Sequence, residues 1–171
     1  MIPDKSGALE LLEIVGCSDK VIKHCLTVAE HSRELANKVK KNGHPIDVEL
    51  VFIGALLHDI GRSITHDIKH AVEGALLGRE HGLNPSIIRI IETHIGAGIA
   101  DTEAKSQGLP QGNYIPSTIE EKIVAHADNL VDDKRIVSIS EKVDKLREKG
   151  MNENIVERTV ELYFYVDEMM H

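Results

Sequence analysis

The stretch GALLHDIGR, residues 54–62, decides how the rest of the chain is interpreted. A strongly apolar segment, residues 51–57, ends in His58 and Asp59, and Gly61 then frees the backbone to turn. Neighbouring side chains on a helix point about 100° apart, so both can reach one ion only near the helix end. A bare His-Asp pair is more often a core histidine beside a capping aspartate. The metal-site interpretation therefore needs support from elsewhere in the chain.

Helical periodicity dominates on both sides of this stretch, and no segment alternates as a half-buried strand does. We expect one all-α domain spanning residues 1–171. The expected helices cover about residues 4–15, 18–41, 51–59, 67–80, 85–94, 117–131, 140–149 and 152–170. The expected helix starts are Ser18, Asn84 before Pro85, and a capping box of Ser117 and Glu120. Residues 96–116 are polar and glycine-rich without pattern, as functional or disordered segments are.

Composition excludes several classes of function. The net charge of -8 argues against binding long nucleic acid, because clustered Lys and Arg bind the phosphate backbone. Aromatic residues, on which bases would stack, make up only 3% of the chain. A small anionic substrate stays compatible, because bound cations invert the field of an acidic site. No apolar run approaches the ~18–20 residues that span a membrane, and the N-terminus lacks a signal-peptide layout. Cys17 and Cys25 fit reduced thiols, so we expect a cytoplasmic protein.

The helix expected over residues 18–41 offers two candidate metal ligands. His24 and His31 both flank its apolar stripe, and spacing alone does not choose between them. Taken singly, each is more often a packing residue than a ligand.

Three later helices add further candidates. His70 has His66 one turn earlier, a spacing that metal-binding histidine pairs use and that a solvated face also produces. His94 shares a face with apolar Ile91, and Asp128 stands among apolar neighbours, where a carboxylate must be paired, neutralised or bound to metal. Several helices thus each present an inward histidine or aspartate. A metal ion is the simplest shared partner for so many buried polar groups.

This pattern resembles the HD superfamily, whose signature is a histidine, an adjacent His-Asp pair and a distant aspartate. The matching segments are KHCLTVA at residues 23–29, the His58-Asp59 pair, and ADN at residues 127–129. The resemblance covers about residues 18–132, the expected metal-binding core, and leaves C-terminal helices over residues 133–171. It implies an HD-domain helical bundle of about seven to nine helices. It also selects His24 as the metal ligand on its helix. His31 would then support the ligands from behind or serve as a packing residue.

The additional histidines resemble those of HD branches that hold a second metal. His70 in KHAVEGA, residues 69–75, matches their first extra ligand, and His94 in THIG, residues 93–96, their second. The Gly-Tyr-Pro extension of HD-GYP cyclic-di-GMP phosphodiesterases is absent, and the 96–116 stretch departs from symmetrical diadenosine tetraphosphate hydrolases. The closest likeness is to uncharacterised archaeal HD hydrolases of similar length.

The resemblance implies a metal-dependent phosphohydrolase that acts on a phosphoester or phosphoanhydride, with a nucleotide as the small-molecule substrate. His24, His58, Asp59 and Asp128 would hold one divalent ion, and catalytic Asp59 would bridge to a second ion held with His70 and His94. This set of imidazole and carboxylate ligands suits Fe, Mn, Co, Ni or Zn better than Mg. Whether one or two ions bind stays open. Arg62 is the candidate donor to a substrate phosphate.

Two other functions stay open. A non-catalytic HD domain would sense nucleotides or bind a partner without turnover, and a diiron HD oxygenase would depend strictly on iron and dioxygen. The segment at residues 96–116 either closes over the substrate, with Lys105 near phosphate, or is a mobile surface loop. The aromatic run at Tyr163, Phe164 and Tyr165 either closes the core or faces a second copy in a homo-oligomer.

Overall fold

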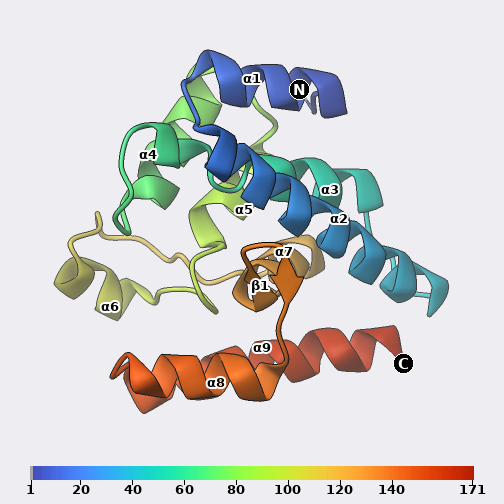
Figure 1. Cartoon of the computed structure of the whole chain (residues 1–171), viewed down its shortest axis with the longest axis vertical. Coiled ribbons are helices and arrows are strands. Elements are labelled where there is room, and N and C mark those ends of the chain that lie inside the picture. The colour runs from blue at the N-terminus through green and yellow to red at the C-terminus, as the bar shows by residue number, and fades with distance from the viewer. Residues whose placement is uncertain (1) are drawn as a thin grey trace.

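The computed structural model describes residues 2–171 and confirms the all-α fold class (Figure 1). Across these residues the α-helices are α1 (Lys5–Ile14), α2 (Asp19–Lys41), α3 (Val48–Leu57), α4 (His70–Glu80), α5 (Pro85–Thr93), α6 (Asp101–Ala104), α7 (Ile119–Leu130), α8 (Ile139–Glu148) and α9 (Glu153–Met170). The 3₁₀-helices are η1 (Ile60–Ser63) and η2 (Lys105–Gln107). The strands β1 (Val131–Asp132) and β2 (Arg135–Ile136) pair as a short antiparallel hairpin, which the sequence pattern did not predict. Within this described part of the chain, no helix has the length and apolar character needed to cross a bilayer.

Side-chain caps determine where the main helices begin. Ser18 caps α2 and Asn84 caps α5, as predicted. The capping box predicted at Ser117 is wrong by one residue, because Thr118 is the N-cap of α7 and accepts a hydrogen bond from the backbone N–H of Glu121. The Glu121 carboxylate in turn accepts from the backbone N–H of Ser117, so the turn before α7 is bonded from both sides.

Helix α3 lies at the centre of the molecule, and this position explains its uniformly apolar sequence. Every residue from Val51 to Leu57 is buried. Helix α2 packs along one side of α3, while α5, α7 and α1 pack against its other sides (Figure 1). The C-terminal end of α3 therefore delivers His58 to the protein interior, where its side chain has no exposed surface.

The turn after α3 lies directly against the start of α4. A Cβ on Gly61 would come within 1.9 Å of the His70 carbonyl oxygen and 2.5 Å of the Gly74 nitrogen, so only glycine fits there. This glycine does more than end a helix, because it lets η1 approach α4. Helix α4 begins at His70 rather than near Asp67. His66 consequently lies in an exposed turn, and the helical pair predicted for His66 and His70 does not form.

The segment at residues 96–116 has a defined structure of its own. Ile99 and Tyr114 pair as an isolated β-bridge near its two ends, and α6 and η2 lie between them. Four buried residues form a separate hydrophobic cluster, namely Ile99, Ala104, Leu109 and Tyr114. Arg158 links the segment to α9 by donating a hydrogen bond to the Glu103 carboxylate at 2.7 Å. Periodicity did not predict this arrangement, because short elements leave no repeat to detect.

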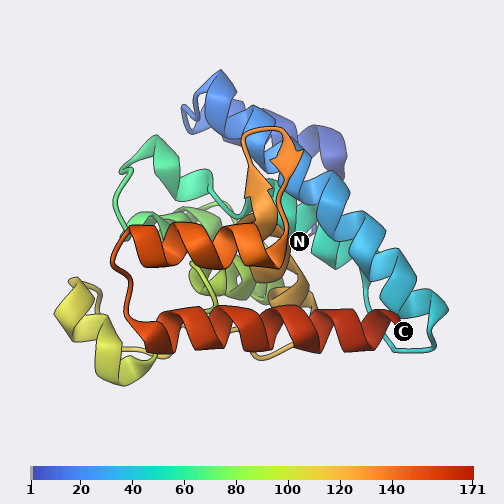
Figure 2. The ribbon, with the colours of Figure 1, turned by 60° about the horizontal axis from the view of Figure 1, so that its bottom comes forward.

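Helices α8 and α9 lie side by side as an antiparallel pair, seen in orange and red in Figure 2. Leu162 and Val166 of α9 join the main core, and α9 packs on α7 and α2. On the opposite face, Phe164 is 59% exposed. One face of α9 therefore closes the core, while the homo-oligomer stays a prediction.

Candidate metal centre

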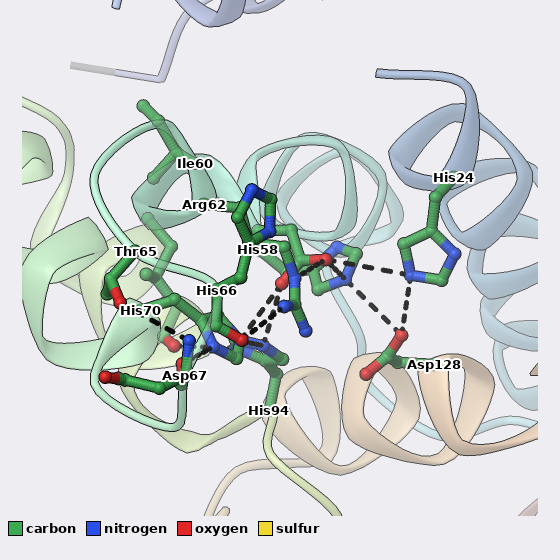
Figure 3. Close-up of polar contacts among 12 residues, drawn as sticks. His24, His58, Ile60, Arg62, Thr65, His66, Asp67, His70, His94 and Asp128 are labelled. Atoms are coloured by element: carbon green, nitrogen blue, oxygen red, sulfur yellow. Dashed lines mark hydrogen bonds and ion pairs between the residues drawn. The ribbon is translucent and has the colours of Figure 1, made fainter. Parts of the chain in front are cut away.

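Five helices bring all six predicted ligand residues to one place. His24 comes from α2 and Asp128 from α7, whereas the remaining four stand at or next to helix ends. Each of the six lies within ion-pair distance of at least one other (Figure 3). The residues are His24, His58, Asp59, His70, His94 and Asp128. Three overlapping groups among them have ligand atoms close enough to share an ion.

The first part of the cluster surrounds one oxygen of Asp128. Oδ1 of Asp128 lies 2.9 Å from Nε2 of His24 and 3.4 Å from Nε2 of His58. Oδ2 of Asp59 completes this group, 3.7 Å from Nε2 of His58 and 3.9 Å from Nε2 of His24. Two imidazole nitrogens and two carboxylate oxygens thus face a common space, which is a ligand set that transition metals favour.

The second part of the cluster surrounds the other oxygen of Asp59. Oδ1 of Asp59 lies 3.1 Å from Nε2 of His70 and 3.4 Å from Nε2 of His94. These two histidine nitrogens are only 3.0 Å apart. Asp59 therefore presents one oxygen to each part of the cluster, and it is the residue that joins them.

Backbone carbonyls orient three of the four histidines. Nδ1 of His58 lies 2.6 Å from the carbonyl oxygen three residues earlier, and the corresponding distances are 2.6 Å for His70 and 2.7 Å for His94. A carbonyl oxygen only accepts, so each Nδ1 carries the proton and donates. Each Nε2 is then the atom left to bind a metal ion or a second proton, as in metal sites whose histidines are held from behind.

Two buried atoms of the cluster lack a hydrogen-bond partner within the described residues. They are Nε2 of His58 and Oδ1 of Asp59. Buried polar atoms of native proteins are rarely left unpaired, because each costs free energy. Both atoms point into the cluster, and a cation is the partner that an imidazole lone pair and a carboxylate oxygen share. The residues present therefore fit a divalent ion.

Charge balance within the cluster leads to the same conclusion. Burial raises the pKa of Asp59, but His58, His70 and His94 more than offset it and hold the pKa well below its usual range. Asp128 is likewise kept ionised, burial being outweighed by His58 above all. Burial lowers the pKa of His58, yet Asp59, Cys25 and Asp128 together more than reverse this and raise it well above its ordinary value. Buried Asp59 and partly buried Asp128 thus require nearby positive charge, either a proton on His58 or a cation.

Arg62 lies at the edge of the cluster. Its Nε donates to Oδ2 of Asp59 at 2.7 Å, and its Nη1 donates to the His66 carbonyl oxygen at 3.2 Å. The side chain is 30% exposed, so the guanidinium is accessible from solvent while it touches the carboxylate. This placement is compatible with the predicted role in substrate binding, which stays a prediction.

Two cavities are each lined by more than one residue of the cluster. One, of about 310 Å³, is lined by Ser18, Lys20, Val21, His24, Asp59, Arg62 and His66. The other, of about 250 Å³, is lined by Arg62, His70, His94, Ile95, Gly96, Asp128, Asn129, Lys142, Leu146, Met151, Ile155 and Thr159. Arg62 borders both cavities. A small molecule in either cavity would therefore contact residues of the cluster.

Sequence reasoning missed Lys142, the cation that α8 contributes to the second cavity. Its helix lies after the last motif residue. In an amphipathic helix with more than one lysine, the sequence pattern does not indicate which lysine faces a cavity. The other internal histidines lie outside the cluster. His31 is half-buried on α2, with a buried Nδ1 that has no hydrogen-bond partner among the described residues, and His126 packs against the ring of Tyr163.

Comparison with known proteins identifies relatives of the whole chain. The chain is 47% identical over 154 residues to an uncharacterized protein of Methanocaldococcus jannaschii, with 90% of each chain covered. It is 44% identical over 166 residues to the tRNA (cytidine(56)-2'-O)-methyltransferase of Thermoplasma volcanium. That match covers 97% of this chain but 47% of the methyltransferase, so the chain spans about half the length of this relative.

Solved structures share the fold. The HD domain of the L. monocytogenes phosphodiesterase PgpH superposes with a TM-score of 0.58 at 16% identity, covering 94% of this chain and 99% of that domain. The same domain in complex with cyclic-di-AMP gives the same TM-score. A family model described as HD domain matches residues 21–132, which include His24, the His58-Asp59 pair and Asp128. The resemblance noted in the sequence is confirmed: this chain belongs to the HD domain family.

Proposed function

We propose that this chain is a metal-dependent phosphohydrolase that cleaves a phosphoester or phosphoanhydride of a nucleotide. The observation that carries the proposal is a pair of buried atoms, Nε2 of His58 and Oδ1 of Asp59, that have no hydrogen-bond partner among the described residues and lie inside a cluster of four histidines and two aspartates. Membership of the HD domain family supports it. The fold shared with a phosphodiesterase domain that binds cyclic-di-AMP favours a nucleotide substrate.

The donor set suits one or two divalent ions. His24, His58, Asp59 and Asp128 would hold the first ion, and Asp59, His70 and His94 would contribute to a second. Mixed nitrogen and oxygen ligands favour Fe, Mn, Co, Ni or Zn over Mg. When bound, such ions supply Lewis acidity, which makes water nucleophilic near neutral pH and neutralises charge on phosphoryl oxygens.

The chain's own residues position the reacting groups. Carbonyl oxygens hold the Nδ1 protons of His58, His70 and His94, so each Nε2 stays directed into the cluster. Asp59 is the proposed catalytic residue because it alone presents an oxygen to both parts of the cluster. Arg62 is the proposed phosphate-binding residue, and it would exchange its contact with Asp59 for two parallel hydrogen bonds to a substrate phosphoryl group.

Turnover assays on defined metal forms test the proposal. Protein stripped with chelator is reloaded separately with Mn, Co, Ni, Zn, Mg or, under anaerobic conditions, Fe(II). Each form is assayed by chromatography against nucleoside mono-, di- and triphosphates, dinucleoside polyphosphates and cyclic dinucleotides. We expect hydrolysis that chelator abolishes and that Asp59→Asn reduces by at least about 10³-fold. His81→Ala removes an exposed histidine at the C-cap of α4 and serves as the matched control.

The same assays separate the competing functions. Nucleotide binding without turnover in every metal form would identify a sensing or partner-binding domain and overturn the proposal. Turnover that requires both iron and dioxygen would instead identify a diiron oxygenase. Hydrolysis at the wild-type rate in Asp59→Asn would remove the assignment of this cluster as the active site.

A further inference from the structure

The second cavity has two walls of different chemistry. His70, His94 and Asp128 form the wall at the metal cluster, whereas α8, α9 and the connection between them form the opposite wall. This second wall lies beyond residue 132, where the match to the family model ends. The cavity volume of about 250 Å³ lies just below the ~300–1,000 Å³ range of small-molecule sites, so it suits a small ligand. A molecule held here would touch the ions and the C-terminal helices together.

Lys142 of α8 is the cation on the second wall of this cavity, and Arg62 also lines the cavity. It is half-buried, and among the described residues it makes no ion pair or hydrogen bond. Burial lowers the pKa of Lys142, and Asp128 is the strongest influence in the opposite direction. The neighbouring lysine on the same helix, Lys145, is by contrast paired with Asp132. The three donor hydrogens of Lys142 are thus free for an anion beside the cluster.

An apolar surface continues from Lys142 along the same wall. Leu146 lies one helical turn beyond Lys142, and Met151 and Ile155 continue the surface onto α9. Met151 is 40% exposed although its side chain is apolar. A cation followed by an apolar wall matches a ligand with an anionic head and a flat, weakly polar body. A nucleoside monophosphate has this shape, and its phosphate would lie at the cluster end.

We propose that Lys142, Leu146, Met151 and Ile155 form the subsite for the nucleoside monophosphate part of the substrate, with Lys142 and Arg62 on its phosphate. This inference rests on the proposed function for its substrate class and adds the residues that select that class. The subsite takes a single nucleotide unit, because the volume of the cavity is only about 250 Å³. Lys142 acts here as a binding residue.

Binding measurements on the Mn(II)-loaded chain test the subsite without relying on turnover. Dissociation constants for AMP, GMP, CMP and UMP, and for inorganic phosphate and adenosine, are measured by calorimetry. We expect Lys142→Met to weaken nucleotide and phosphate binding by at least about tenfold and to leave adenosine binding unchanged. Ile155→Asp should weaken nucleotide and adenosine binding but leave phosphate binding intact. Lys142→Arg should restore most of the nucleotide affinity.

Lys149→Met is the matched control, because Lys149 is exposed on the turn after α8 and does not line the cavity. Circular dichroism and metal content confirm that each variant is folded and loaded. Wild-type affinity in Lys142→Met, or no saturable binding of any of the four nucleotides to the wild type, would overturn the subsite. Failure of the proposed function is distinguishable, since nucleotide binding that depends on Lys142 without any hydrolysis would retain the subsite and reject the enzyme.

Discussion

Nε2 of His70 lies 3.0 Å from Nε2 of His94, although the protonated Nδ1 of each ring already faces a backbone carbonyl oxygen. Two imidazole lone pairs at this separation repel each other unless positive charge lies beside them. Oδ1 of Asp59 is within 3.4 Å of both nitrogens, so an anion is available to hold such a charge. The pair of histidines is therefore built around a cation, whether a proton or a metal ion.

The first prediction concerns metal stoichiometry. Protein purified without a histidine tag or added metal should contain about two equivalents of transition metal by elemental analysis. His94→Ala should contain about one, because it removes a ligand from only one part of the cluster. His81→Ala, which changes an exposed histidine, should match the wild type. About one equivalent in all three proteins would restrict binding to His24, His58, Asp59 and Asp128.

The second prediction concerns Arg62. Replacing it with alanine removes the forked donor but no proposed metal ligand, so metal content should stay unchanged while KM for a phosphorylated substrate rises about tenfold. Arg62→Lys should recover only part of this loss, since an ammonium cannot form two parallel hydrogen bonds. Arg79→Ala breaks a surface pair with Glu92 and is the control. Wild-type KM and kcat in Arg62→Ala would remove the assignment.

The third prediction concerns Gly61. A methyl group there would meet the His70 carbonyl oxygen at 1.9 Å, so η1 and α4 must separate. Gly61→Ala should lower the free energy of unfolding by about 1–3 kcal/mol or more, and it should reduce metal content because His70 moves with α4. Gly112→Ala is the control, since its nearest new contact is an ordinary 3.4 Å to Tyr114. Equal urea midpoints for the two variants would contradict the expected clash.

The fourth prediction concerns Cys17. Burial, and next the neighbouring Cys25, raise the pKa of the Cys17 thiol to about 11. The rate of alkylation by iodoacetamide, followed by mass spectrometry, should therefore rise with an inflection near pH 11 in the native protein and near the ordinary thiol value in urea. Between the two values the unfolded thiol is ionised and the folded one is not, so this group's contribution to stability is lost as pH rises. A native inflection near pH 9 would show that Cys17 is not desolvated.

The apolar run before His58 predicted both the central helix and the direction of its end, because a helix apolar on every side has nowhere to lie except the core. The local sequence pattern did not determine whether His24 or His31 is the candidate metal ligand. Both lie on one helical face, and only contact with Asp128, 104 positions away in the chain, separates them. The resemblance supplied that long-range information in advance, whereas periodicity could not.

Features built from short or irregular elements were not predicted. The segment at residues 96–116 is closed by a single bridge between Ile99 and Tyr114, and its small cluster leaves no repeat in the sequence. The start of α4 was placed too early, because the turn at Asp67 is bonded locally and helical propensity does not distinguish it from a first turn. Lys142 was missed because its importance depends on where α8 packs.

The cavity wall formed by α8 and α9 has an evolutionary consequence. Its residues lie after position 132, outside the region that defines the family, whereas every proposed ion ligand lies inside that region. If Lys142 and the apolar wall form the proposed subsite, substitutions in the C-terminal helices would change which molecule binds and would leave the proposed ion ligands unchanged. We expect relatives that keep the six histidines and aspartates but differ at Lys142 and Ile155 to catalyse the same type of reaction on different substrates.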